Sequence, residues 1–118
     1  MAKAKRGANF TLHDLRVEVV PGKKPFVTHC KAGEYFDVVG GRLIFPKKSF
    51  SLYALMAVLP FIPAKQRETE ANDWMTTDTE IASLDPHCGA RFRITRRRKR
   101  KLRHADYSVV PLAKGRRR

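Results

Sequence analysis

The stretch that decides the fold is FSLYALMAVLPFI, residues 50–62. It holds no charged residue and reads as a helix capped by Ser49 or Ser51, running to Leu59 and closed by Pro60. One helix face carries large apolar side chains, and the opposite face is apolar too. Such a helix is normally buried against a sheet, so we expect it to be the centre of the core. The side chains expected to be buried are Leu55, Met56 and Leu59.

Strand patterns flank this helix on both sides. LRVEVV (15–20) alternates apolar and charged residues, FVTHC (26–30) is a second short candidate, and EYFDVVGGRLIF (34–45) predicts a hairpin turning at Gly40-Gly41. After the helix, ARFRITR (90–96) alternates again, and DYSVVPL (106–112) is a candidate last strand. The pattern predicts one α+β domain, with a small, mostly antiparallel sheet packed on one buried helix.

Positive charge is concentrated at one end of the chain. The sequence has 118 residues, with 25 Lys and Arg against 11 Asp and Glu. Residues 91–118 hold thirteen of the basic residues and a single acid, Asp106, whereas residues 1–90 are close to neutral. We therefore divide the chain into a basic N-terminal tail (1–10), an α+β domain (11–95) and a strongly basic C-terminal segment (96–118).

Apolar runs and cysteines indicate the compartment. The run at 50–62 is shorter than the roughly 20 residues needed to span a bilayer, and no apolar stretch of signal-peptide type follows the basic start. The two cysteines, Cys30 and Cys88, are too few for a disulfide framework. We expect a cytoplasmic protein without a transmembrane segment and with reduced thiols.

Several boxes, in the same order, resemble a family of small uncharacterised prokaryotic α+β proteins. They are a Cys-x-x-Gly-acid box (CKAGEYFDV, 30–38), an apolar YAL helix ending in Pro (50–67) and an Asp-Pro turn before the C-terminal strand (DPHCGARFRI, 85–94). The resemblance covers about residues 12–95. It implies a compact α+β fold and brings no activity with it. Many relatives carry a Cys just before the Asp-Pro turn, where this chain has Ser83.

A repeated dipeptide offers a possible metal or thiol site. His29-Cys30 and His87-Cys88 together supply the ligands of a Cys₂His₂ zinc site, and His13 and His104 are further candidate ligands. Neighbouring side chains on a strand point to opposite faces, which disfavours this arrangement. The alternative is that both cysteines are small buried apolar residues. A resident cofactor is therefore not expected, with zinc or iron as the alternative.

The run RRRKRKLR (96–103) is the strongest functional signal. Its like charges repel one another and disfavour order unless an anion is near, although the alternation of the preceding strand predicts that the strand continues a little way into the run. Most of these residues are arginines, whose guanidinium group can bind a phosphate through two hydrogen bonds. No aromatic residue is interleaved in the run, which indicates contacts to the nucleic-acid backbone rather than stacking on bases. The predicted polyanion-binding residues are Arg96, Arg97, Arg98, Lys99, Arg100, Lys101, Arg103, Arg116, Arg117 and Arg118.

The sequence is consistent with two functions. The first is a small non-catalytic module whose basic segment docks on a polyanion, with nucleic-acid backbone preferred over an acidic protein partner, an anionic membrane surface or a purely solubilising tail. The second is an accessory subunit of a multi-component enzyme, with a metal or thiol site near Cys30 and Cys88. No common catalytic motif is present, so a catalytic role is not favoured. The pattern leaves the oligomeric state open.

Overall fold

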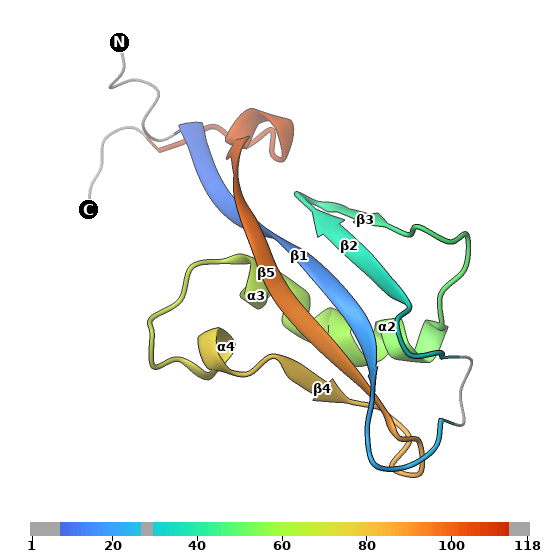
Figure 1. The fold of residues 1–118 in the computed structure, drawn as a ribbon. Helices are drawn as coiled ribbons and strands as arrows, with labels where there is room; N and C mark the ends of the chain where they lie inside the picture. The colour runs from blue at the N-terminus through green and yellow to red at the C-terminus, as the bar shows by residue number, and fades with distance from the viewer. Residues whose placement is uncertain (1–7, 27–29, 114–118) are drawn as a thin grey trace.

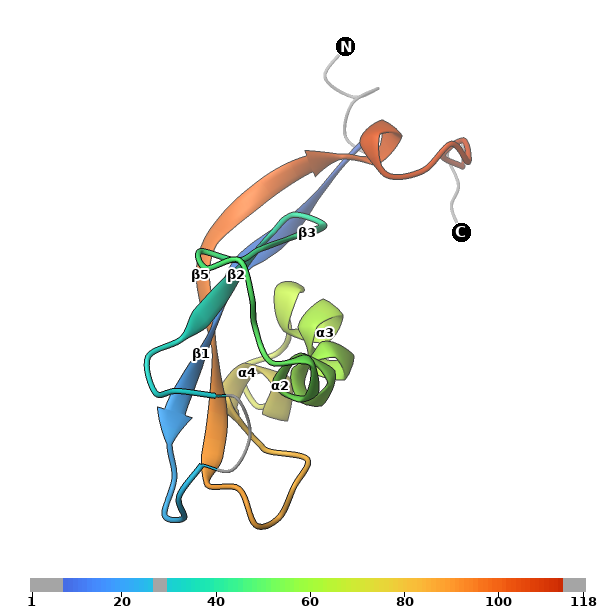
Figure 2. The ribbon, with the colours of Figure 1, turned by 90° about the vertical axis from the view of Figure 1, so that its right-hand side faces the viewer.

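The sheet is antiparallel and has five strands in the order β3-β2-β1-β5-β4. The computed structural model describes residues 8–26 and 30–113. The strands are β1 (Asn9–Pro21), β2 (Tyr35–Val39), β3 (Arg42–Ile44), β4 (Glu80–Ala82) and β5 (Ala90–Arg103). β1 and β5 are the two long strands at the centre, and the helices lie on one side of the sheet (Figure 1, Figure 2). This confirms the predicted α+β fold with a small antiparallel sheet.

The main helical segment consists of α2 (Leu52–Val58), the 3₁₀ turn η2 (Leu59–Phe61) and α3 (Ile62–Gln66). The hydroxyl of Ser51 caps α2 by accepting from the amide of Ala54 at 3.2 Å. Pro60 does not close the segment as expected. It stands in the first turn of η2, where its missing N–H costs no helical hydrogen bond, and the chain continues into α3. The shorter elements are α4 (Trp74–Thr77) and the 3₁₀ turn η3 (His104–Asp106).

The inward face of α2 is formed by its small residues. Ala54, Ala57 and Val58 are buried, whereas Met56 is 48% and Leu59 41% exposed, so their predicted burial was wrong. Leu55 is half-buried and packs at the edge of the core. Since α2 is apolar all round, its pattern could not specify which face turns inward. Small side chains let the helix lie close to the sheet.

The core lies between this helical face and one face of the sheet. Val17 is directly opposite Phe36 on β2 and Ile94 on β5, and all three are nearly inaccessible to solvent. Directly opposed residues share a sheet face, so the three strands present one continuous apolar surface to the helices. Cys30 and Cys88 belong to the same cluster of buried residues.

β1 and β5 continue as a pair beyond the rest of the sheet. β2 pairs with β1 only at residues 15–18, and β4 pairs with β5 only at residues 91–93. Residues 9–13 of β1 pair with residues 99–103 of β5, and no other described strand pairs with either segment. We call this two-stranded part the basic ribbon. The expected boundary between residues 95 and 96 therefore falls inside β5.

A β-bulge separates the basic ribbon from the core. Leu15 is opposite Arg96 and His13 is opposite Lys99, so Arg97 and Arg98 together face the single residue Asp14. The extra residue shifts the alternation of β5 by one position. As a result Lys99 lies on the same face as Arg96 and Ile94. In a regular strand its odd spacing from these two residues would place it on the opposite face.

The remaining strand predictions had mixed outcomes. The hairpin at Gly40-Gly41 is confirmed, with Gly40 at φ 60° in the left-handed region that favours glycine. Residues 27–29 lie outside the described residues, and neither Phe26 nor Cys30 is in a strand. The last predicted strand, 106–112, was wrong: the chain turns at η3, and Tyr107 packs on the hairpin glycines instead. No described helix is long and apolar enough to cross a membrane.

Candidate polyanion-binding surface

One face of the basic ribbon is entirely polar. The register places Asn9 opposite Arg103, Thr11 opposite Lys101, and His13 opposite Lys99. Opposed residues share a face, and these six alternate with the residues of the other face. All are exposed except His13, which is intermediate. The ribbon thus presents Lys, Arg, Asn and Thr side chains side by side from two strands, and we call this surface the ribbon face.

The opposite face of the ribbon is anchored to the protein. Phe10, opposite Leu102, packs edge-on against Tyr107, with ring centroids 5.4 Å apart. Leu12 is only 5% exposed. A Cβ added to Gly40 would lie 2.9 Å from the Tyr107 hydroxyl, so Tyr107 packs closely on the hairpin turn. One face is therefore fixed by packing, which leaves the ribbon face to solvent.

Arg100 belongs to the anchored face and neutralises a buried carboxylate. Its Nε and Nη2 donate to the two carboxylate oxygens of Asp14 at 2.9 and 2.8 Å, and Asp14 is 7% exposed. The hydrogen bonds from Arg100 lower the pKa of Asp14, although burial opposes the shift, and they raise the pKa of Arg100. Arg100 is therefore committed to structure, as bidentate arginine–carboxylate pairs often are.

Arg96 also has a structural role, because it binds the backbone at the end of α3. Its guanidinium donates to the carbonyl oxygens of Lys65 and Arg67, both at 2.8 Å, and to the hydroxyl of Thr69 at 2.9 Å. These carbonyls lie at the C-terminal end of a helix, where a cation is favourable. Arg96 thus ties β5 to the helical layer instead of offering its donors to a ligand.

Lys99 and Arg103, two cations of the ribbon face, each pair with an exposed carboxylate. Lys99 and His13 both contact Glu68 at 3.2 Å, and these contacts, that of Lys99 first, lower the pKa of Glu68. Arg103 pairs with Asp106 at 2.9 Å. Both carboxylates are more than half exposed, so the pairs are weak and the cations can exchange them for phosphate.

Three predicted residues keep their full charge for a ligand. Arg97, Arg98 and Lys101 are exposed and form no salt bridge with any residue in the described part of the chain. Arg97 and Arg98 occupy the bulge, and Lys101 stands on the ribbon face. Arg116, Arg117 and Arg118 lie outside the described residues.

Sequence reasoning missed the contribution of β1. The predicted basic N-terminal tail (1–10) overlaps β1, because Asn9 and Phe10 belong to the strand. The signal was present, because Phe10 and Leu12 alternate with Thr11 and His13 in the pattern of a half-buried strand.

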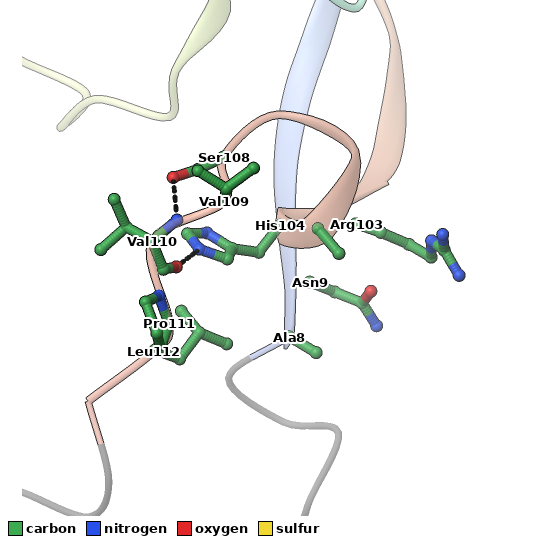
Figure 3. A pocket seen from close by; sticks show the side chains of 10 residues that line it. Ala8, Asn9, Arg103, His104, Ser108, Val109, Val110, Pro111 and Leu112 are labelled. Carbon is green, nitrogen blue, oxygen red and sulfur yellow. Dashed lines mark hydrogen bonds between the residues drawn. The ribbon is translucent and has the colours of Figure 1, made fainter.

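The tip of the ribbon also borders a pocket of about 530 Å³. It lies between the start of β1, η3 and the segment 108–112 (Figure 3). The His104 ring is hydrogen-bonded to the Val110 carbonyl at 2.7 Å. Asn9 and Arg103 lie on one side of the pocket, and the apolar residues Pro111 and Leu112 lie on the other (Figure 3). The ribbon face therefore ends at a partly apolar hollow.

The described part of the chain does not assemble the candidate metal site. Cys30 and Cys88 are buried in the core, whereas the His87 side chain is 87% exposed and contacts Asp85. His29 lies outside the described residues. Among residues 8–26 and 30–113, no three His, Cys, Asp or Glu side chains gather to hold a metal ion.

No protein-family model, curated protein or solved structure matches this chain.

Proposed function

We propose that this chain is a non-catalytic binding module that docks on the phosphate backbone of a nucleic-acid duplex through its basic ribbon. The observation that carries the proposal is the ribbon face itself: two paired strands, anchored on one side, with Lys99, Lys101 and Arg103 on the other. The cations stand on a paired strand, so less entropy is lost when a ligand orders them.

The dimensions of the ribbon suit a duplex groove. Five residue pairs, from Asn9–Arg103 to His13–Lys99, give the ribbon face a length of about 14 Å at 3.4 Å per residue. The major groove of B-form DNA, about 12 Å wide, admits a two-stranded β-ribbon. A ribbon lying there places the cations of β5 beside the phosphates of one groove wall.

The residues divide into two roles in this proposal. Arg97, Arg98 and Lys101 contact phosphates directly, since none of them forms a salt bridge with a described carboxylate. Lys99 and Arg103 contact phosphates after leaving Glu68 and Asp106. Phosphate contacts carry little sequence information, so the affinity should be nearly independent of sequence. Asn9 and Thr11, the uncharged residues of the ribbon face, supply hydrogen bonds to the backbone or to base edges.

The test is a titration of duplex DNA of two unrelated sequences at about 50 and 200 mM salt. We expect similar affinities for both sequences and a steep loss of affinity at the higher salt, because each phosphate contact lowers log K by about 0.9 per tenfold rise in salt. Replacing Arg97, Arg98 and Lys101 by Gln should abolish most binding and flatten the salt dependence.

A matched variant controls for net charge. Lys23, Lys24 and Lys31 are exposed, form no salt bridge in the described part of the chain, and lie far from residues 96–103 in the sequence. Their replacement by Gln removes the same charge and should change the affinity only slightly. Equal losses in both triple variants, or no binding at low salt, would refute the ribbon as the docking surface.

A further inference from the structure

The outer face of α2 is an apolar surface that the described residues leave uncovered. Leu52 and Tyr53 are each 61% exposed, Met56 is 48% and Leu59 is 41% exposed. Their spacing of three and four residues places them on one side of the helical segment. Figure 2 shows α2 and α3 on one side of the sheet, with no described element beyond them.

The chemistry of this face differs from that of the rest of the surface. Residues 50–62 contain no charged side chain in a chain of net charge +14. Tyr and Met side chains are enriched at the centre of protein–protein interfaces, where charged residues are depleted. A contiguous group of exposed apolar side chains commonly marks an interaction site.

The two ends of the apolar face differ: Lys47 and Lys48 lie near one end, and α4 lies at the other. Lys47 and Lys48 precede α2 in the segment from β3, and both are exposed. At the other end Phe61 packs edge-on against Trp74 of α4, with ring centroids 6.0 Å apart, and Trp74 is 55% exposed. Figure 1 shows the β3–α2 connection on one side of the helical layer and α4 on the other.

The end near α4 is acidic. Glu70, Asp73 and Asp78 surround Trp74 in the sequence. None of them forms a salt bridge with another described residue. The apolar face therefore runs from a basic end to an acidic end.

We propose that this face binds a second copy of the same chain, with the two α2 helices antiparallel about a two-fold axis. In a two-fold interface each copy uses the same surface, so that surface must be complementary to itself. The antiparallel arrangement meets this condition: apolar side chains meet at the centre, and Lys47 and Lys48 of one copy face the acidic end of the other. The basic ribbons, whose like charges would repel, take no part in the contact.

The first experiment measures the mass of the nucleic-acid-free full-length protein by sedimentation equilibrium over a range of concentrations. We expect a dimer, and we expect Met56→Glu to be monomeric because it buries a charge at the centre of the contact. Leu84→Glu is the matched control, since Leu84 is 57% exposed and lies outside the α2 face. It should remain dimeric. Circular dichroism of both variants verifies that each is folded.

The second experiment tests the antiparallel arrangement. Lys48→Glu and Glu70→Lys should each weaken the dimer by about fivefold at low salt, as expected for a rim ion pair. The double variant restores the opposite charges and should return the dissociation constant to near the wild-type value. A lack of rescue in the double variant would overturn the proposed arrangement.

Three results would overturn the dimer. They are a monomeric wild type at all concentrations, a Met56→Glu variant that remains dimeric, and a monomer that binds neutral phosphatidylcholine vesicles unless Met56 is changed to Glu. The last result would assign the face to a membrane surface. None of these results bears on the basic ribbon, whose test measures nucleic-acid binding.

Discussion

At the scale of single residues, the seven cations of residues 96–103 are not equivalent. Arg96 holds the end of α3 and Arg100 neutralises Asp14, so both support the fold. Arg97, Arg98 and Lys101 have no such task among the described residues. A uniform run of charge in the sequence therefore becomes a mixture of structural and available cations once the strand is paired.

The Asp14–Arg100 pair predicts a specific dependence of stability on pH. The folded-state pKa of Asp14 is lowered, first by the hydrogen bonds from Arg100, so the pair's contribution is complete above the unfolded-state pKa of about 4. The contribution is lost as the pH falls through the lower folded-state value. We expect Asp14→Asn to lower the free energy of unfolding at pH 7, and the difference from wild type to shrink as the pH approaches 2.

Urea denaturation at a series of pH values measures this effect. Glu70→Gln is the matched control, because Glu70 is exposed and pairs with no described cation. It should leave the profile almost unchanged. A difference between wild type and Asp14→Asn that stays constant with pH would show that the carboxylate charge is not what stabilises this site.

At the scale of elements, the helical layer stabilises the sheet through the small inward face of α2 and through Ile62 of α3. Ile62 is 5% exposed, and Ile62→Ala should lower the free energy of unfolding by about 2–5 kcal/mol. Leu84→Ala removes a side chain of the same size from a site that is 57% exposed and should cost far less. Thermal or chemical denaturation compares the two. Equal losses would mean that α3 does not close the core.

Because β1 shares the ribbon face with β5, changes in β1 should affect nucleic-acid binding. Asn9→Glu together with Thr11→Glu places two negative charges on the ribbon face, about 90 residues away in sequence from Lys101 and Arg103. We expect nucleic-acid binding to be lost. Ala32→Glu with Ala82→Glu adds the same charge at exposed sites outside the ribbon and should have a small effect. If both double variants bind alike, only total charge matters and the ribbon has no role.

The sequence predicted where most strands and the helix lie. It did not predict which face of the helix is buried or which side chains the basic residues contact. Period-two alternation identified β1, β5 and the hairpin, because burial of one sheet face imposes it. The inward face of α2 could not be predicted, since every side of that helix is apolar. The alternation predicted that the strand continues only a little way into residues 96–103, whereas β5 runs through all of them. Its full length depends on Asp14, Glu68 and Asp106 and on pairing with residues 9–13. These partners lie in three separate parts of the chain, and only the fold brings them together.

At the scale of the whole molecule, the two proposed surfaces are separate. The principal dimensions are 56 × 34 × 21 Å, and the ribbon extends beyond the helical layer along the length of the molecule (Figure 1, Figure 2). The charged surface is on the ribbon and the apolar surface is on α2. A dimer formed through α2 would carry two ribbons on one particle, and two linked binding surfaces hold a long polyanion more tightly than one.

The ribbon also has two open strand edges. The outer edges of residues 9–13 and 99–103 pair with no other described strand, and such edges can accept a strand from another molecule. Positive charge along β5 keeps like molecules apart, so it protects the protein against fibril-like self-assembly. A ligand that neutralises this charge removes that protection. The solubility of the complex should therefore depend on the ratio of polyanion to protein, with precipitation favoured where their charges balance.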